Sequence, residues 1–206
     1  MQIIRCRKIG GELRLGRAAL LDVHDVIASG RLVVYPTETV YGLGADPFDE
    51  DAVKRVFKVK RRPASMPISM AVPTPDALWF YGVLDERSRD FCEKHMPGPI
   101  TVLLRATSLA PPPLLSKGRL LGLRVPDHPV ATQLLRACSP LTATSANRHG
   151  RKPPSTCAEA MDQLGNDIDI YIDSGPCRYG QESTVVDLSG GETSIIRRGA
   201  LSEQAF

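Results

Sequence analysis

Segments with helical and strand character alternate through the first two thirds of the chain, and this alternation limits the fold more than any other feature. Helical patterns occur at 18–29, 49–58, 85–95 and 130–137, and short apolar runs typical of strands occur at 32–35, 68–72, 100–104, 120–125 and 141–144. From residue 168 onward strand patterns dominate, and Gly190-Gly191 predicts a hairpin turn. We therefore predict a single α/β domain with helices packed on a mixed parallel and antiparallel sheet.

Length and cysteine usage indicate the class of protein. A chain of 206 residues can bury a sizeable core without a metal or disulfide staple. Its five cysteines are scattered and never spaced as C-x-x-C, which argues against a disulfide framework or zinc site and for a reducing compartment. There is no apolar run of signal-peptide or membrane-span length, so we expect a cytoplasmic protein without membrane association.

A basic run covers residues 54–62, where six of nine side chains are Lys or Arg and none is acidic. Such a run is either a solvated helix face or a site for phosphate or nucleic acid. Because Pro63 disfavours a helical Arg62, we expect this part to be extended, with Lys60 and Arg62 on one side. A Lys–Arg pair of this kind suits a triphosphate, although a basic helix end leading into a loop explains the same residues.

Two further segments place polar side chains directly after apolar strands. Ser145 and Asn147 follow the strand at 141–144, either as a ligand-binding strand end or as an ordinary Ser/Asn turn. Residues 36–44 read P-T-E-T-V-Y-G-L-G, and their glycines would let the backbone approach a ligand closely. The chain contains neither a P-loop motif nor a complete G-x-G-x-x-G motif.

Taken in order, these segments resemble the YrdC-like family, the threonylcarbamoyl-AMP synthases of tRNA modification. The matching pieces are P-T-E-T-V-Y-G-L at 36–43, K-R-R-P at 60–63, P-G-P-I-T at 97–101, R-V-P at 124–126, S-A-N at 145–147, E-S-T-V-V-D at 182–187 and R-R-G-A at 197–200. The resemblance covers about residues 18–201. We therefore expect the short form, with residues 1–206 forming one catalytic domain and lacking the extra C-terminal domain of longer relatives.

The resemblance implies a twisted sheet whose concave, basic face holds ATP and threonine. It implies catalytic roles for Lys60 and Arg62 and assigns residues to two ligands. The residues matched to ATP are Lys60, Arg62, Ser145, Asn147 and Arg197, and those matched to threonine are Thr37, Arg124 and Ser183. No resident metal site is implied, and Mg²⁺ would accompany ATP. The chain departs from the family at Met66 and Ala71, where some members have ligand contacts.

The implied activity joins L-threonine, bicarbonate and ATP into threonylcarbamoyl-adenylate with release of pyrophosphate. A downstream tRNA threonylcarbamoyl-transfer complex would use the product. An alternative of a different class is a module that binds double-stranded RNA or tRNA on the same basic groove, through backbone contacts rather than base stacking. A third hypothesis is a paralogue that makes another carbamoyl or acyl adenylate. The sequence does not determine whether the protein contacts tRNA directly.

Overall fold

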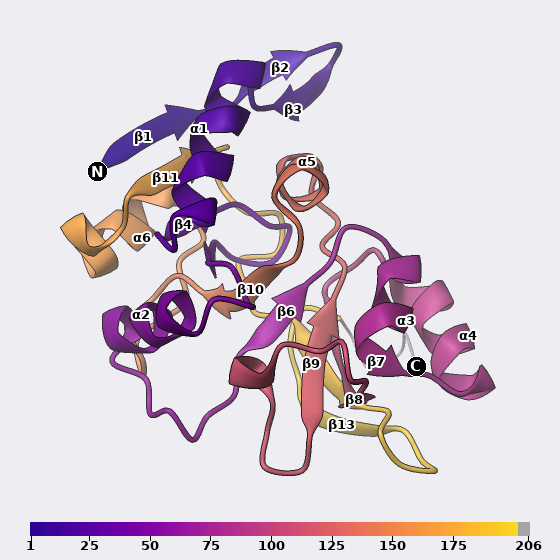
Figure 1. Cartoon of the computed structure of the whole chain (residues 1–206). Helices are drawn as coiled ribbons and strands as arrows, with labels where there is room; N and C mark the ends of the chain where they lie inside the picture. The colour runs from indigo at the N-terminus through magenta and orange to yellow at the C-terminus, as the bar shows by residue number, and fades with distance from the viewer. Residues whose placement is uncertain (202–206) are drawn as a thin grey trace.

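A computed structural model describes residues 1–201, and eleven strands of this part of the chain form one mixed sheet (Figure 1). The strand order along it is β1-β11-β4-β5-β10-β6-β9-β8-β12-β13, and β7 pairs with β8 beside this path. The sheet contains parallel pairs, such as β6 with β9 and β8 with β12, and antiparallel pairs, such as β5 with β10 and β12 with β13. The predicted α/β class with a mixed sheet is confirmed.

The elements follow the chain in the predicted order. The strands of the large sheet are β1 (Gln2–Arg5), β4 (Val33–Tyr35), β5 (Gly42–Gly44), β6 (Ser69–Ala71), β7 (Gly82–Val83), β8 (Ile100–Ala106), β9 (Leu120–Arg124), β10 (Leu141–Ser145), β11 (Ile170–Asp173), β12 (Thr184–Asp187) and β13 (Ser194–Arg197). The helices are α1 (Arg17–Ala28), α2 (Glu50–Lys60), α3 (Leu78–Tyr81), α4 (Glu86–His95), α5 (Pro129–Cys138) and α6 (Cys157–Leu164). Short 3₁₀ turns occupy Pro75–Ala77, Pro112–Leu114 and Gly165–Asp167.

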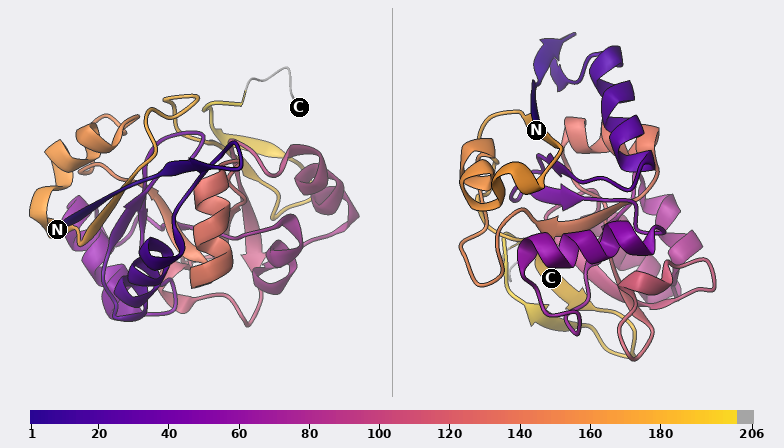
Figure 2. Two further views of the ribbon diagram at one scale, coloured as in Figure 1. Left: turned by 90° about the horizontal axis from the view of Figure 1, so that it is seen from above. Right: turned by 60° about the vertical axis from the view of Figure 1, so that its left-hand side comes forward.

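Helices cover the two faces of the sheet unequally, and this inequality leaves room for a site. One face carries the larger core, to which α2, α3, α4 and α6 contribute buried side chains (Figure 2). On the other face, α1 and α5 pack side by side and form a smaller core with Val33, Ala71 and Leu141. This second pair of helices covers only part of its face. The remaining strands on that side are free to line a cavity.

The N-terminal residues form strands that the sequence patterns did not indicate. Strand β1 pairs in parallel with β11, and β2 (Arg7–Ile9) with β3 (Glu12–Arg14) makes a separate hairpin that extends from the top of Figure 1. Arginines interrupt this stretch and only Ile4 of β1 is buried, so the local pattern is weak. The pairing partner lies about 170 residues later in the chain, and short-range periodicity carries no information about it. No helix within residues 1–201 is long and apolar enough to cross a membrane.

Candidate active site

A row of directly paired residues crosses the uncovered face of the sheet. Tyr35, Gly42 and Ser145 lie opposite one another on β4, β5 and β10, and Ala143 of β10 lies opposite Ser69 of β6. Farther along the row, Leu103 of β8 lies opposite Gly122 of β9. Thr101 of β8 lies opposite Val185 of β12, and Val185 in turn lies opposite Arg197 of β13. Directly opposite residues share a sheet face. Residues distant in sequence therefore line one surface.

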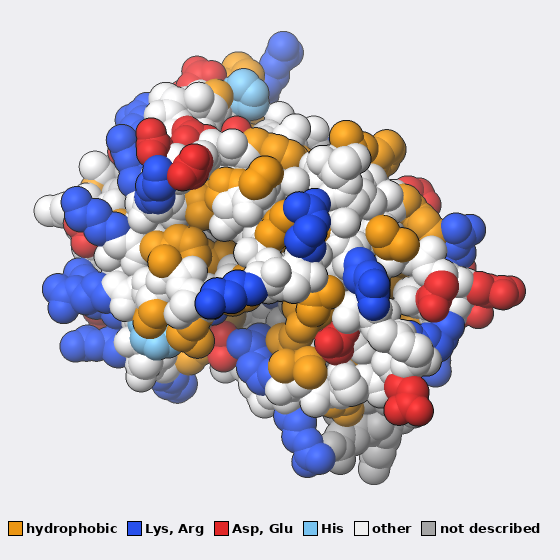
Figure 3. All heavy atoms as spheres, turned by 60° about the horizontal axis from the view of Figure 1, so that its bottom comes forward, with side chains coloured by type: hydrophobic (Ala, Val, Ile, Leu, Met, Phe, Trp, Pro, Cys, Tyr) orange, Lys and Arg blue, Asp and Glu red, His pale blue; other side chains and the backbone are white. Residues whose placement is uncertain are grey.

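Small side chains in the middle of this row hollow the surface into a cavity of about 530 Å³. A Cβ atom on Gly122 would lie 2.3 Å from the Ser69 Oγ, so any larger residue here would displace the Ser69 side chain from its place on the cavity floor. Gly42 lies under the Tyr35 ring, whose hydroxyl donates to the Thr142 carbonyl at 3.1 Å. In Figure 3, which turns the bottom of the molecule forward, Lys and Arg side chains lie around the middle of the face.

Lys60, the last residue of α2, joins this helix to the end of β10. Its side chain is 1% exposed, and its ammonium donates to the carbonyl oxygens of Ser145 and Asn147, the latter at 2.8 Å, and to the Asn147 Oδ1 at 3.3 Å. The Lys60 carbonyl in turn accepts from the His149 amide at 2.7 Å. Burial, and secondarily the Arg62 charge, lower the pKa of Lys60 to about 7, while Glu182 acts in the opposite direction.

The predicted extended geometry of Lys60 is wrong. The helix continues through Lys60, and the turn comes at Arg61, whose φ of 52° and ψ of 40° are left-handed and end the helix. Lys60 and Arg62 consequently differ in position. Arg62 lines the cavity, whereas Lys60 lies behind its wall, beneath Ser145. The proline affected only its immediate neighbour, and the amphipathic pattern of α2 governed Lys60.

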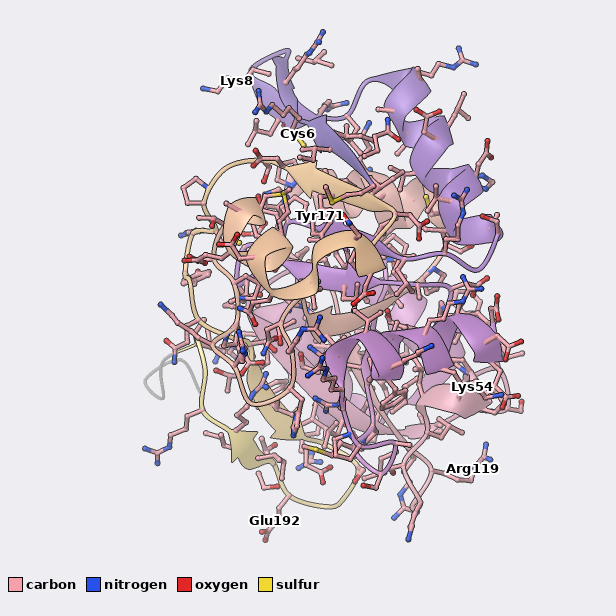
Figure 4. The ribbon with its side chains drawn as sticks, turned by 90° about the vertical axis from the view of Figure 1, so that its left-hand side faces the viewer. Cys6, Lys8, Lys54, Arg119, Tyr171 and Glu192 are labelled. Carbon is pink, nitrogen blue, oxygen red and sulfur yellow. The ribbon has the colours of Figure 1, made fainter. Side chains whose placement is uncertain are left out.

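The residues of the basic run differ in their surroundings, because most are exposed and Arg62 lines the cavity. Lys54 points outward from α2 (Figure 4) and pairs with Glu50 at 2.9 Å on an exposed surface. Arg55, Lys58 and Arg61 are also exposed. Arg62 is turned inward by hydrogen bonds from its guanidinium to the carbonyls of Met66 and Pro67, at 3.1 and 3.0 Å. Burial lowers the pKa of Arg62, and Glu182 partly offsets this.

A buried ion pair supports the wall formed by residues 37–39. The Arg124 guanidinium donates to the Glu38 Oε1 at 2.6 Å and to the Thr39 Oγ1 at 3.2 Å from each terminal nitrogen. Glu38 is 2% exposed, and neither its Oε2 nor the Arg124 Nε has a partner among the described residues. The Thr37 hydroxyl forms hydrogen bonds within the same segment, at 2.8 Å to the Thr39 hydroxyl and at 2.6 Å to the Val40 carbonyl oxygen. Thr37 and Arg124 both line the cavity.

The opposite wall comes from the segment before β12 and from the edge strand β13. The hydroxyls of Ser183 and Thr101 lie 2.8 Å apart across β8 and β12. Arg197 donates to the Ser183 carbonyl at 2.9 Å and to the Glu182 carboxylate at 3.1 Å. Glu182 also lies 3.4 Å from the Ser145 hydroxyl, so this wall reaches the end of β10.

The structure thus brings together all eight predicted site residues. Arg62, Ser145 and Arg197, with Thr37, Arg124 and Ser183, line the cavity directly. Lys60 and Asn147 lie behind it and contact each other. Of the two departures from the family pattern, Met66 lines the cavity, whereas Ala71 packs in the core beneath α1 and α5.

Two carboxylates of the site, Glu38 and Glu182, were not predicted. Glu38 directly follows the predicted Thr37, and Glu182 directly precedes the predicted Ser183. Charge balance could have found them, because buried or clustered arginines require anionic partners. Nowhere in residues 1–201 do three or more His, Cys, Asp or Glu side chains cluster so as to hold a metal ion.

An open α/β sheet with a cationic cavity on the part of one face that its helices leave uncovered is the architecture of a protein that binds a small anionic ligand. The sequence profile of a family described as "Telomere recombination", which groups Sua5, YciO and YrdC, matches residues 25–199. The chain belongs to this family, and the predicted resemblance is confirmed.

Individual relatives agree with this assignment. The threonylcarbamoyl-AMP synthase of Chromohalobacter salexigens is 34% identical over 177 residues, covering 84% of this chain and 95% of that protein. Pyrococcus abyssi Sua5 complexed with L-threonine superposes with a TM-score of 0.90 at 31% identity, covering 97% of this chain and 58% of that longer one. Escherichia coli YciO superposes with a TM-score of 0.88 at 25% identity, over 100% of this chain and 98% of that chain.

Proposed function

We propose that this protein is a threonylcarbamoyl-AMP synthase that makes threonylcarbamoyl-adenylate from L-threonine, bicarbonate and ATP. Relatives bearing this enzyme name are 32–34% identical to it, so the nucleotidyltransferase predicted from the sequence is confirmed at the level of the family. One observation of the structure carries the proposal furthest: the cavity has arginines at two separate places. Arg62 and Arg197 lie near Glu182, and Arg124 lies beside Thr37 and Thr39.

These two places suit the two anionic substrates. Arg62 and Arg197 offer planar donor groups to the triphosphate, and Ser145 at the end of β10 is a further donor to the nucleotide or its metal. Arg124 would receive the threonine carboxylate, and Thr37 and Ser183 would orient the amino acid. Pyrococcus abyssi Sua5 binds L-threonine on the same fold, which supports an amino-acid subsite here.

Lys60 and Asn147 act from behind the cavity wall in this assignment. The ammonium fixes the carbonyls of Ser145 and Asn147, and so sets the direction of the Ser145 hydroxyl. The charges of Arg62 and Glu182 act on the pKa of Lys60, so Lys60 lies close enough to this part of the cavity to contribute to the potential that a triphosphate meets. Lys60 is therefore a positioning residue with an electrostatic contribution.

The chemistry needs no covalent intermediate with the protein. The threonine amine adds to the carbon of bicarbonate, losing water, and forms a carbamate. A carbamate oxygen then attacks the α-phosphorus of ATP. The bond between the α-phosphorus and the oxygen that bridges to the β-phosphate breaks, and pyrophosphate leaves with that oxygen. The protein contributes orientation of the two substrates and preorganised positive charge. Mg²⁺, arriving with ATP, would neutralise phosphate oxygens as the charge on pyrophosphate develops.

Pyrophosphate release tests the proposal. The purified protein is given ATP and Mg²⁺, with threonine and bicarbonate each present or absent, and pyrophosphate is measured. We expect release only when all three substrates are present, and other amino acids in place of threonine should give far less. Release with a different amino acid would indicate the paralogue reading.

The RNA-binding alternative predicts a different result. It requires tight binding of double-stranded RNA or tRNA that weakens steeply with salt, without pyrophosphate release. As an enzyme of tRNA modification, the protein would act in the cytoplasm and pass its product to a tRNA threonylcarbamoyl-transfer complex. Direct contact with tRNA would serve that transfer, and the same salt titration measures it.

A further inference from the structure

One carboxylate lies among the cationic groups of the proposed triphosphate site. Glu182 accepts from the Arg197 guanidinium at 3.1 Å and lies 3.4 Å from the Ser145 hydroxyl. Its charge raises the pKa of both Lys60 and Arg62, against the effect of burial. The acid is therefore near four groups assigned to the nucleotide end of the cavity.

A bare carboxylate at this place conflicts with the proposed ligand. A triphosphate brought next to Arg62 and Arg197 would also come next to Glu182, and two anions at such distance repel each other. A divalent cation between carboxylate and phosphate oxygens reverses the sign of this interaction. The presence of the acid is then an advantage for binding rather than a cost.

The donor set around Glu182 fits magnesium. Mg²⁺ prefers oxygen ligands and is usually held by one or two carboxylates together with substrate phosphates and water. The Glu182 Oε1 is engaged by Arg197, but its Oε2 has no hydrogen bond to any described residue, and the side chain is 36% exposed toward the cavity. The Ser145 hydroxyl supplies a further oxygen nearby, which carries no charge. With no cluster of three acidic, His or Cys side chains within residues 1–201, the ion would bind only together with the nucleotide.

We propose that Glu182 is the protein's carboxylate ligand for the Mg²⁺ that accompanies ATP, with the Ser145 hydroxyl beside it. This inference rests on the proposed function, since it requires a nucleotide in the cavity. The competing explanation is that Glu182 only neutralises Arg62 and Arg197 until the triphosphate replaces it. The two explanations predict opposite effects of removing the charge.

Binding of an ATP analogue with a methylene group between the α- and β-phosphates, which cannot release pyrophosphate, separates the explanations. Affinity is measured by titration calorimetry with excess Mg²⁺ and again with a chelator, for the wild-type protein and for Glu182→Gln. A metal ligand predicts that Glu182→Gln binds the Mg²⁺ complex about tenfold or more weakly, while the metal-free analogue binds equally well or more tightly. A neutralising carboxylate predicts tighter binding by Glu182→Gln in both conditions, and that result overturns the proposal.

Two variants and a spectroscopic measurement complete the test. Glu192→Gln removes the same charge from the same β12–β13 hairpin, but at its far end away from the cavity (Figure 4), and should leave both affinities unchanged. Glu182→Asp keeps a carboxylate and should retain part of the Mg²⁺ dependence. Substituting Mn²⁺ lets electron paramagnetic resonance count the bound ion directly, and Glu182→Gln should release it at analogue concentrations that hold it in the wild type.

Failure of this inference differs from failure of the proposed function. If the wild-type protein releases pyrophosphate from ATP with threonine and bicarbonate, and Glu182→Gln shows the same ratio of affinities with and without Mg²⁺, only the metal assignment is wrong. If the wild-type protein neither binds the analogue nor releases pyrophosphate, the enzyme assignment itself is wrong.

Discussion

The Lys60 ammonium lies 2.8 Å from the carbonyl oxygen and 3.3 Å from the side-chain oxygen of Asn147, a residue 87 positions later in the chain. The Asn147 amide nitrogen then donates to the carbonyls of Arg148 and Arg151, at 3.0 and 2.6 Å. The end of α2 and the loop after β10 are therefore one hydrogen-bonded unit. Two of the motifs that carry the family resemblance, at 60–63 and 145–147, are physically joined at this point.

Replacing Lys60 should lower stability as well as activity. Lys60→Met keeps the length of the side chain but leaves three buried oxygen acceptors without their donor, and an unsatisfied buried group costs about 1–3 kcal/mol. We expect a loss of this order in urea denaturation, with pyrophosphate release reduced well over tenfold. Lys58→Met, on the exposed side of the same helix, should leave both unchanged. A fully stable Lys60→Met protein would show that these contacts contribute nothing to folding.

The lowered pKa of Lys60 predicts that nucleotide binding takes up a proton. With a pKa of about 7, Lys60 is largely neutral at pH 8, whereas ATP is by then fully ionised. A bound triphosphate favours the charged lysine and raises its pKa. The complex then holds more protons than the free protein, so affinity should fall as pH rises above 7. Calorimetry at pH 8 in buffers of different ionisation enthalpy should give an uptake approaching about one proton. The uptake should vanish at pH 6 and in Lys60→Met.

Arg62 and Arg197 should matter for activity more than for folding. Both side chains are partly open to the cavity, and removing a preorganised charge contact of this kind costs about 2–4 kcal/mol of transition-state stabilisation. Arg62→Ala and Arg197→Ala should each reduce pyrophosphate release well over tenfold while circular dichroism melting changes little. Arg55→Ala, from the exposed part of the same basic run as Arg62, serves as the control. Near-normal turnover in Arg62→Ala would remove this residue from the site.

The Glu38–Arg124 pair should show strong coupling between its two members. Arg124→Met leaves the Glu38 carboxylate buried and unpaired, which typically costs about 3–5 kcal/mol. Glu38→Gln with Arg124→Met removes both charges, so the double variant should recover much of the lost stability. Urea denaturation of the four proteins measures the cycle. The exposed Arg14–Glu12 pair at 2.8 Å is a control, since a surface pair contributes at most about 1 kcal/mol. Additive losses at positions 38 and 124 would contradict the coupling.

Sequence patterns predicted those parts of the fold that depend on local periodicity. Helix α2 is amphipathic, and strand β10 begins with the buried residues Leu141 and Thr142, so both elements were predicted within a few positions. Strand β5 was missed because it is only Gly42–Gly44, and glycine has low strand propensity. These residues are extended because neighbouring strands pair with them on both sides and Tyr35 covers them. A tertiary cause of this kind leaves no local signal.

The site was predictable as a set of residues but not as an arrangement. The ordered motifs indicated the eight residues, and all eight lie in or behind one cavity. Their division between lining and support depends on where α2 ends, and the left-handed Arg61 moves Lys60 away from Arg62. The roles of Glu38 and Glu182 follow from which arginines they meet, and those arginines come from other strands.

Gly199 offers a test of how closely the two ends of the last hairpin must approach. A Cβ atom there would lie 2.3 Å from the Glu182 carbonyl oxygen and 2.4 Å from the Ser183 carbonyl carbon, both backbone atoms that cannot rotate away. Gly199→Ala must therefore shift residues 182–183, together with the Glu182 carboxylate and the Ser183 hydroxyl in the cavity. We expect weaker binding of the ATP analogue, a higher KM for threonine and some loss of stability. Gly191→Ala is the matched control, because a Cβ atom at the turn of the same hairpin meets nothing within 4 Å. If the two alanine variants show the same kinetics, the spacing of this wall does not set the geometry of the site.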